Sequence, residues 1–531
     1  MYSGDVTRIV FICEFQVFKI YSIENVMSYE IIIGLEIHVQ LQTKTKIFCG
    51  CSTAFNPDHP NVQTCPVCLG LPGALPVLNE QAYYLGVKTA LGLGCQIAPY
   101  TKWDRKQYFY PDLPKGYQIS QFDLPFSHHG QVDVVTGDSS ANGGKEPIVR
   151  RVRILRAHLE EDAGKNMHDE SGRGRDSKVD LNRAGTPLVE IVTEPDLRSA
   201  DEARRFLEEL RLMLTYLEVS DCNMQEGSLR CDANVNLHVT QPDGTKVPTP
   251  IVEIKNLNSF RFTEQAIEYE VARQWESFQQ TGIRMGAKGG HKRTVGFDPN
   301  RGSTYPLREK EEAADYRYFP DPDLVPVMTS VEKINSIRAE MCELPATRRQ
   351  RILDEFQLSP YDAAVIIDQG RAVADYFEEV AKTCGDGKQA ANWLTQDMQA
   401  AMKERDETIS NFPIRPPVLS ALLDRINKKQ ITIKSAREVF AALLVDADGG
   451  AALSVDRIDE LVKSRGLAIV QDTGAIETAI AEVLSRNAKA IADFKSGNEK
   501  AIGALIGQVM KSVKGADPQT VREKLLTKLA E

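Results

Sequence analysis

Alternating hydrophobic and polar residues predict the first strand of this chain. Over 28–41, hydrophobic residues occupy every second position, and Glu36 and His38 occupy two of the positions in between. Because successive side chains of a β-strand point to opposite faces, one face packs and the other presents this carboxylate and this imidazole. The alternation returns over 228–239, and a Pro-Asp-Gly turn then leads into a strand over 249–257, which predicts a hairpin.

Strand patterns end near residue 326, and helical spacing replaces them. Before that point, period-two segments are interspersed with a few helical stretches, which predicts an α+β domain with a largely antiparallel sheet. Beyond it, alanine, leucine and charged residues recur at helical spacing and predict two all-α regions. We therefore expect an extension outside the fold, an α+β domain, a helical domain and a helical tail, with the boundaries 1–26, 27–326, 327–457 and 458–531.

Composition and charge narrow the function classes. The chain has 531 residues, of which 42% are hydrophobic and 26% charged, which is typical of a globular protein with several domains. Its net charge of −10 excludes binding of nucleic acid by bulk attraction, although 481–531 has more basic than acidic residues. No apolar run is long enough to cross a membrane, and no secretory signal is recognisable, so we expect a cytoplasmic protein.

Four of the ten cysteines, Cys49, Cys51, Cys65 and Cys68, lie close together in the sequence. Two pairs of thiolates on tight turns suit a closed tetrahedral zinc site, and such clustering in a cytosolic chain favours metal over disulfide. The alternatives are a set of reduced, half-buried thiols and a redox dithiol. Since four thiolates leave no open coordination position, we expect a zinc ion here to stabilise the fold, with catalysis elsewhere.

Acidic residues on the predicted strands form a second candidate site. Glu36 and His38 share one strand face, and Glu190 lies among apolar residues, where ionisation is costly without a cation or a basic partner. The adjacent acids Glu160 and Glu161 point to opposite sides of a further strand, and we place Glu161 on the side of the site. If Glu36, His38, Glu161 and Glu190 converge, they suit Mg²⁺ or Mn²⁺ bound to nucleotide phosphates. The alternative is a set of solvated acids on an exposed sheet.

The sequence contains none of the common phosphate-binding loop motifs. There is no Walker A sequence, no Gly-x-Gly-x-x-Gly after a strand and no nucleophile elbow, which argues against P-loop, Rossmann and serine-hydrolase chemistry. Over 102–117, basic residues that include Lys106 alternate with aromatic ones, a mixture that can contact phosphates and stack on bases. An aromatic-rich loop packed over the sheet fits the same pattern.

Several ordered motifs resemble one known family. These motifs, and the order in which they follow one another from residue 27 to the C-terminus, are similar to those of the B subunit of aspartyl/glutamyl-tRNA amidotransferases, the GatB family. The motifs are IGLEIHV at 33–39, KQYFYPD at 106–112, YQISQFD at 117–123, HLEEDAGK at 158–165, DLNR at 180–183, EGSLRCDAN at 226–234, EIKNLNS at 253–259, DYRYFPDPD at 315–323 and GQVMK at 507–511.

The resemblance implies a cradle related to glutamine synthetase, a helical domain and a YqeY-like tail that binds tRNA. It also implies an ATP-dependent carbon–nitrogen ligase that works as a heterotrimer with an amidase, which is the A subunit, and a small C subunit. In this family the amidase releases ammonia from glutamine. The B subunit phosphorylates the side chain of Glu mischarged on tRNA(Gln), or of Asp on tRNA(Asn), and the ammonia then replaces the phosphate.

The resemblance also assigns roles to the candidate residues. Glu36, His38, Glu161 and Glu190 are the expected magnesium ligands or catalytic neighbours, and Lys106 is the expected contact to phosphate or substrate. The four cysteines match a zinc site that only some members of the family keep.

Two alternatives and two departures accompany this resemblance. One alternative is the archaeal relative that amidates only Glu-tRNA. That relative carries an inserted domain, whereas in this sequence the strand patterns pass directly into helical patterns, without space for such a domain. The other alternative is a non-catalytic, zinc-containing scaffold that binds tRNA. Such a scaffold would not require acidic residues on apolar strands. The segment before Met27 has no counterpart in the family pattern, and the loop over 137–146 is longer than usual.

Overall fold

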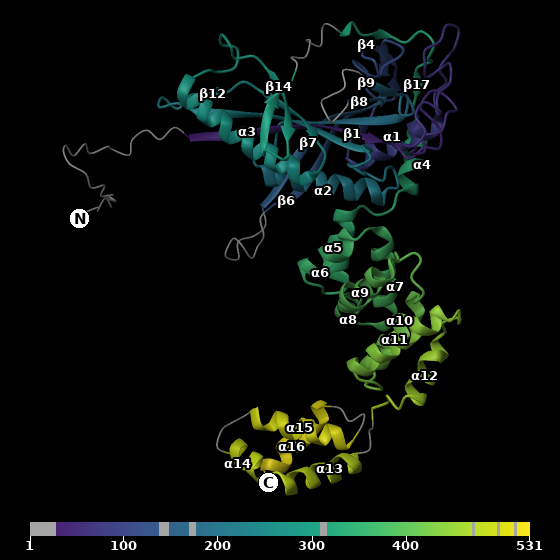
Figure 1. The fold of residues 1–531 in the computed structure, drawn as a ribbon, viewed down its shortest axis with the longest axis vertical. Helices are drawn as coiled ribbons and strands as arrows, with labels where there is room; N and C mark the ends of the chain where they lie inside the picture. Colours follow the sequence, from purple (N-terminus) through teal and green to yellow (C-terminus); the bar gives the residue numbers. More distant parts are fainter. Residues whose placement is uncertain are drawn as a thin grey trace, which may run out of the picture. The chain divides into compact units, whose positions relative to one another are not determined.

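The computed structural model confirms the predicted separation of a sheet-rich N-terminal part from a helical C-terminal part (Figure 1). The predicted extension over 1–26 and the predicted loop over 137–146 lie outside the described residues. The structure describes residues 28–136, 148–168, 177–307, 316–469, 473–495, 500–513 and 518–530. The chain divides into two compact units, of which the first comprises Met1–Glu209 and Cys222–Asn335, and the second Leu210–Asp221 and Ser336–Glu531.

A ten-stranded sheet organises the first unit. Its pairings among the described strands are antiparallel except for that of β13 with β14, as the hairpin patterns predicted. β12 (Lys246–Pro248) pairs with β11 at one side. The other strands lie in the spatial order β15 (Ser303–Pro306), β14 (Arg293–Asp298), β13 (Val252–Leu257), β11 (Leu229–Thr240), β1 (Ser28–Gln40), β10 (Pro187–Thr193), β7 (Ile148–Glu161), β6 (Ser127–Thr136) and β2 (Gln96–Ile97).

The central strands of this sheet have one apolar, fully buried face. Ile37 of β1 lies opposite Ile191 of β10, and Val39 lies opposite Val189, so the alternation predicted for the first strand continues across its neighbour. All four side chains are 0% exposed. Side chains that alternate with these four lie on the other face, which is therefore free to carry polar groups.

Helices pack against the apolar side of the sheet, and capping residues determine where they begin and end. α3 (Phe260–Thr281) contacts β11 and β13; the Ser259 hydroxyl caps its N-terminus, and Gly282, with φ 65°, ends it. α1 (Glu80–Gly92) begins at Asn79, whose side chain accepts hydrogen bonds from two backbone N–H groups. α2 (Ala200–Tyr216) lies beside α3, joined to it by an ion pair between Arg204 and Glu264.

The other described strands of the first unit form three smaller sheets. In the three-stranded sheet, β4 (Asp104–Gln107) lies between β5 (Tyr117–Ser120) and β16 (Phe319–Pro320). β17 (Val327–Met328) pairs with β3 (Tyr100–Thr101), so strand structure continues past the predicted boundary at 326. The last pair is β8 (Lys165–His168) with β9 (Ser177–Asp180), and α4 (Val331–Glu340) follows β17.

The described residues of the second unit are mainly helical and form two apolar cores. Ile458 and Leu461 belong to the first core, so the predicted tail boundary at 458 falls inside a helix of that core. No helix among the described residues is long and apolar enough to cross a membrane. The first core involves α5 (Pro345–Glu355), α6 (Pro360–Asp368), α7 (Arg371–Cys384), α8 (Gly387–Asn392), the π-helical turn η2 (Trp393–Met398), α9 (Gln399–Arg405), α10 (Pro416–Asn427), α11 (Ile433–Asp448) and α12 (Val455–Ser464). The second involves α13 (Thr473–Arg486), α14 (Ala488–Lys495), α15 (Lys500–Ser512) and α16 (Pro518–Ala530).

A partly buried ion-pair network joins α5 to α7. The Glu378 carboxylate accepts hydrogen bonds from Arg348 at 2.9 Å, Arg351 at 2.6 Å and Lys382 at 3.0 Å. Burial by itself would raise the pKa of Glu378, but the three cations outweigh it and lower the pKa to about 2. The ionised carboxylate therefore stabilises the fold above pH 4.5, its usual pKa, and this contribution is lost as the pH falls towards 2.

Replacing Glu378 with glutamine should destabilise the helical core by about 3 kcal/mol at pH 7, because partly buried arginines lose their anion. The difference from wild type should shrink at pH 3, because the Glu378 carboxyl group of the unfolded chain, with its usual pKa of 4.5, is already protonated there, and folding then has to remove that proton. Denaturant titrations of the full chain at both pH values measure this effect. Glu379→Gln, at an exposed neighbouring position, is the matched control. An equal loss at both pH values would contradict the assigned role of the charge.

Candidate active site and metal centre

The polar face of the large sheet gathers five ionisable side chains from three adjacent strands. β1 contributes Glu36 and His38, β10 contributes Glu190, and β7 contributes His158 and Glu160. The register brings them together, because His38 lies opposite Glu190 and Glu190 lies opposite His158. Directly opposed residues of antiparallel strands project from the same face, so the three strands form one cluster.

Glu190 lies at the centre of this cluster. Its Oε2 atom is 3.5 Å from Nε2 of His38 and 3.5 Å from Nε2 of His158. Nε2 of His38 is also 3.6 Å from Oε1 of Glu36, and Nε2 of His158 is 3.7 Å from Oε2 of Glu160. Two possible ligand sets for a cation therefore share Glu190, and in each set the ligand atoms lie within 4.8 Å of one another.

The electrostatics of the cluster favour a cation. Burial would raise the pKa of Glu190, but the imidazoles of His158 and His38 and the ammonium of Lys106 hold it well below its usual value. Burial and the Glu190 carboxylate both raise the pKa of Glu36. A divalent cation would relieve this repulsion, and each ligand set offers two carboxylates and one imidazole, so the residues fit Mg²⁺ or Mn²⁺.

Lys106 is brought to the same cluster. It extends from β4, and its Nζ lies 5.2 Å from the ring centre of Tyr316 and 5.9 Å from that of Tyr108. Burial opposes its charge, but the carboxylates of Glu160 and Glu190 raise the pKa of Lys106 above its usual value. Lys106 therefore remains a cation between aromatic rings and the carboxylates, as a phosphate contact requires.

Glu161 does not join this cluster, so the expectation that it shares the face of Glu36, His38 and Glu190 is wrong. It follows Glu160 on β7 and so projects to the other side of the strand. There its carboxylate pairs with Lys115 and accepts a hydrogen bond from the backbone N of Ile119 at 2.8 Å. Glu160, and not Glu161, lies on the face of β7 that joins Glu36, His38 and Glu190.

Four further polar residues of the site were missed from the sequence. Two are His158 and Glu160; their alternation indicates that they share one face of β7, but only the pairing of β7 with β10 shows that this face joins Glu190. The others extend the polar face beyond β1, since Asp232 of β11 lies opposite Glu36 and Lys255 of β13 forms an ion pair with Asp232. Their contribution depends on strand order, which local pattern does not reveal.

The two adjacent glutamates should respond differently to substitution. We expect Glu160→Gln to raise the Mg²⁺ concentration required for activity, because Glu160 belongs to a ligand set. Glu161→Gln should leave that requirement unchanged but cost about 3 to 5 kcal/mol of stability, because it leaves the buried Lys115 unpaired. Magnesium titrations of activity and denaturant unfolding of both variants separate the two roles. A shifted magnesium requirement in Glu161→Gln would restore Glu161 as a ligand candidate.

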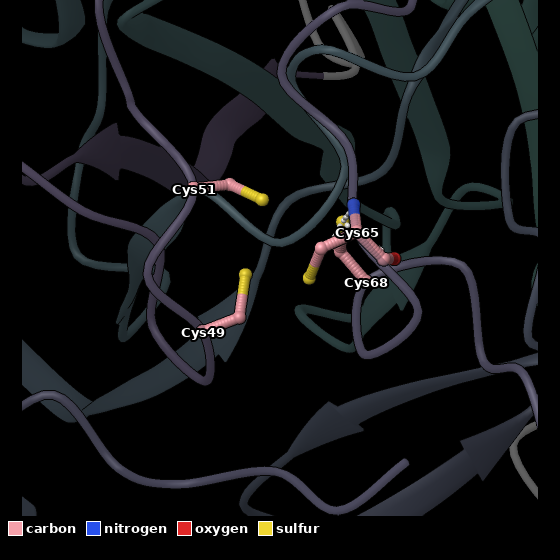
Figure 2. Close-up of side chains that lie close together, drawn as sticks. All are labelled: Cys49, Cys51, Cys65 and Cys68. Carbon is pink, nitrogen blue, oxygen red and sulfur yellow. Dashed lines mark hydrogen bonds between the residues drawn. The ribbon is translucent and has the colours of Figure 1, made fainter.

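The four clustered cysteines also meet. Figure 2 shows Cys49 and Cys51 on one segment and Cys65 and Cys68 on another, and their sulfur atoms all lie within 4.8 Å of one another. The backbone N of Cys65 donates to Sγ of Cys68 at 3.1 Å. None of the described cysteines forms a disulfide. Four sulfurs at these separations, on two tight turns, fit a tetrahedral Zn²⁺ ion.

One of these thiols is ionised readily. The hydrogen bond with the Cys49 thiol lowers the pKa of Cys68 to about 4, with smaller help from the Cys65 backbone and the Lys46 ammonium. Burial raises the pKa of Cys51 to about 11. The environment therefore already stabilises a thiolate at Cys68, which is the form that binds metal.

Comparison with known proteins places this site in a family. The model for the GatB/GatE catalytic domain matches residues 31–335, and the model for the GatB domain matches 375–529. A relative from Rhodopirellula baltica is 51% identical over 94% of this chain and 97% of its own length. Relatives from Geotalea daltonii and Trichlorobacter lovleyi are 47% and 46% identical over 95% of this chain and 100% of theirs. All three are named as the B subunit of aspartyl/glutamyl-tRNA(Asn/Gln) amidotransferase. The resemblance seen in the sequence motifs is thus confirmed, and the chain belongs to the GatB family of amidotransferase B subunits.

Proposed function

We propose that this chain activates and amidates the side chain of Glu mischarged on tRNA(Gln), or of Asp mischarged on tRNA(Asn). The names of its relatives support this substrate class, and the matches cover nearly the whole chain. The observation that carries the proposal is the cluster around Glu190, which lies within the region matched by a catalytic-domain model. That match also disfavours a non-catalytic, zinc-containing tRNA-binding scaffold.

The reaction has to make a carboxylate reactive towards ammonia. An oxygen of the substrate carboxylate attacks the γ-phosphorus of ATP, the bond to the bridging oxygen breaks, and ADP leaves. Ammonia then attacks the carbon of the resulting acyl phosphate, phosphate leaves, and the nitrogen loses a proton to give the amide. Phosphate is a far better leaving group than oxide, which is why the first step is needed.

The residues of the cluster suit the phosphoryl transfer. Glu36, His38 and Glu190, together with His158 and Glu160, would hold the divalent cation, for which we propose Mg²⁺; when bound, it neutralises charge on the transferred phosphoryl group. Lys106 supplies a further positive charge towards the phosphates or the substrate carboxylate. Glu160 and Glu190 are 3% and 6% exposed, so their carboxylates act in largely desolvated positions, where electrostatic interactions with a bound cation are strong.

We also propose partners and a second metal. The designation of the relatives as B subunits supports a complex with other chains, for which we propose an amidase as the A subunit and a small C subunit in a cytoplasmic heterotrimer. We assign the helical tail to tRNA binding because basic residues outnumber acidic ones over 481–531. The four cysteines are assigned to a structural Zn²⁺ ion.

The function is tested with the complex that also contains the amidase and the C subunit. Supplied with mischarged tRNA, ammonia, Mg²⁺ and ATP, it should form amidated tRNA and ADP in equal amounts. Glu36→Gln should lower this rate about 10²- to 10³-fold while tRNA binding survives. Glu30→Gln is the matched control, since Glu30 lies on the same strand but pairs with Arg198 outside the cluster. Full activity of Glu36→Gln would reject the metal-site assignment.

A further inference from the structure

A lysine side chain is completely buried behind the four cysteines. Lys46 is 0% exposed. Its Nζ donates to the carbonyl oxygen of Gln63 at 2.7 Å, and lies 3.5 Å from that of Leu181 and 3.7 Å from Sγ of Cys68. Carbonyl oxygens satisfy its hydrogen bonds but do not neutralise its charge. Because a buried ammonium is costly without an anion, Lys46 needs a negative partner.

No carboxylate provides that partner within the described part of the chain, since none lies within 4.0 Å of the Lys46 ammonium. Glu161 lies in the same region, because a Cβ atom at Gly185 would approach both the Lys46 side chain and the Glu161 carboxylate. Its carboxylate, however, is already paired with Lys115. Sγ of Cys68 is therefore the group near Lys46 that can carry negative charge.

We propose that Lys46 is the buried counter-cation of the four-cysteine centre. This inference rests on the proposed zinc site. Four thiolates around Zn²⁺ carry a net charge of −2, which is unfavourable in a half-buried position without a neighbouring cation. An ammonium that donates to the sulfur of Cys68 offsets part of that charge, as hydrogen-bond donors around ligands do in other metal sites.

Lys46 also connects this centre to the strands of the active site. It approaches Leu181, and the backbone N of the next residue, Ile47, donates to the carbonyl of Gly185 at 2.9 Å. The N–H of Gly185 in turn donates to the carbonyl of Asp162 at 2.8 Å. The loop so held leads from β9 into β10, which carries Glu190. The Lys46 ammonium thus lies between the four-cysteine centre and the loop that leads to Glu190.

The test is zinc retention by the full chain. Lys46→Gln keeps a hydrogen-bond donor for the carbonyl oxygens but removes the charge. We expect it to release zinc to a chelator about ten- to a hundredfold faster than wild type. Lys44→Gln, at an exposed position in the same segment, should release zinc at the wild-type rate. Full zinc content with wild-type release from Lys46→Gln would overturn the assignment.

A double-mutant cycle tests the charge pairing even if Lys46→Gln folds poorly. Cys68→Ser removes the thiolate and leaves the ammonium without an anion. Lys46→Gln should therefore destabilise the wild-type chain but be neutral or stabilising in the Cys68→Ser background. Additive losses would overturn the pairing. A wild-type chain that holds no zinc would instead overturn the zinc proposal itself, which distinguishes the two failures.

Discussion

Replacing Glu190 with glutamine should abolish ATP-dependent amidation, with a loss of about 10³-fold or more in kcat. Glu190 is the carboxylate that both ligand sets share, and it contacts the imidazoles of both His38 and His158. Glutamine has nearly the same shape, so the substitution removes charge while leaving the packing of β10 largely intact. It therefore weakens both halves of the cation site at once.

The measurement follows ADP and amidated tRNA in the assembled complex over a range of Mg²⁺ concentrations. Excess Mg²⁺ should not restore the rate, because the missing charge belongs to both ligand sets. Glu194→Gln, four positions further along and outside the cluster, should retain wild-type activity. A Glu190→Gln complex that keeps more than about a tenth of the wild-type rate would place the phosphoryl transfer elsewhere.

Replacing Cys65 with serine should remove about one zinc ion per chain and destabilise the first unit by about 4 kcal/mol. The ion is expected to bind only the folded arrangement, because 13 residues separate Cys51 from Cys65 in the sequence and only folding brings them together. Its binding free energy thus adds to the free energy of unfolding. Metal analysis and thermal unfolding of the full chain measure both quantities.

Treatment of the wild-type chain with a strong chelator should reproduce the loss of stability, and it should have little effect on Cys65→Ser. Cys342→Ser is the control, since Cys342 lies in the helical unit, outside the cluster. A wild-type protein that is free of metal and equally stable with and without chelator would remove the structural role of the four cysteines.

The sequence was most informative where the signal is local. The alternation over 28–41 predicted β1 with its buried and polar faces, because strand period is set within the strand itself. The four cysteines could be grouped because they lie close together along the chain. In both cases neighbouring residues carry the information, and the structure brings the expected side chains together.

The choice between Glu160 and Glu161 shows where such prediction ends. A shift of one residue in strand register moves every side chain to the opposite face, and the register of β7 is set by β10, far away in sequence. Lys46 is a second example, since its partners Leu181 and Cys68 lie on separate segments. The boundary at 326 was placed too early to include β17, because a strand of two residues has no readable period.

The position of β10 between two partners makes this segment sensitive to insertions and deletions. Its residues are paired on one side with β1 and on the other with β7. One additional residue inside the strand would turn an apolar neighbour of Glu190 towards the histidines and drive the carboxylate into the core. The chain can thus vary in length at its outer loops far more freely than along Pro187–Thr193.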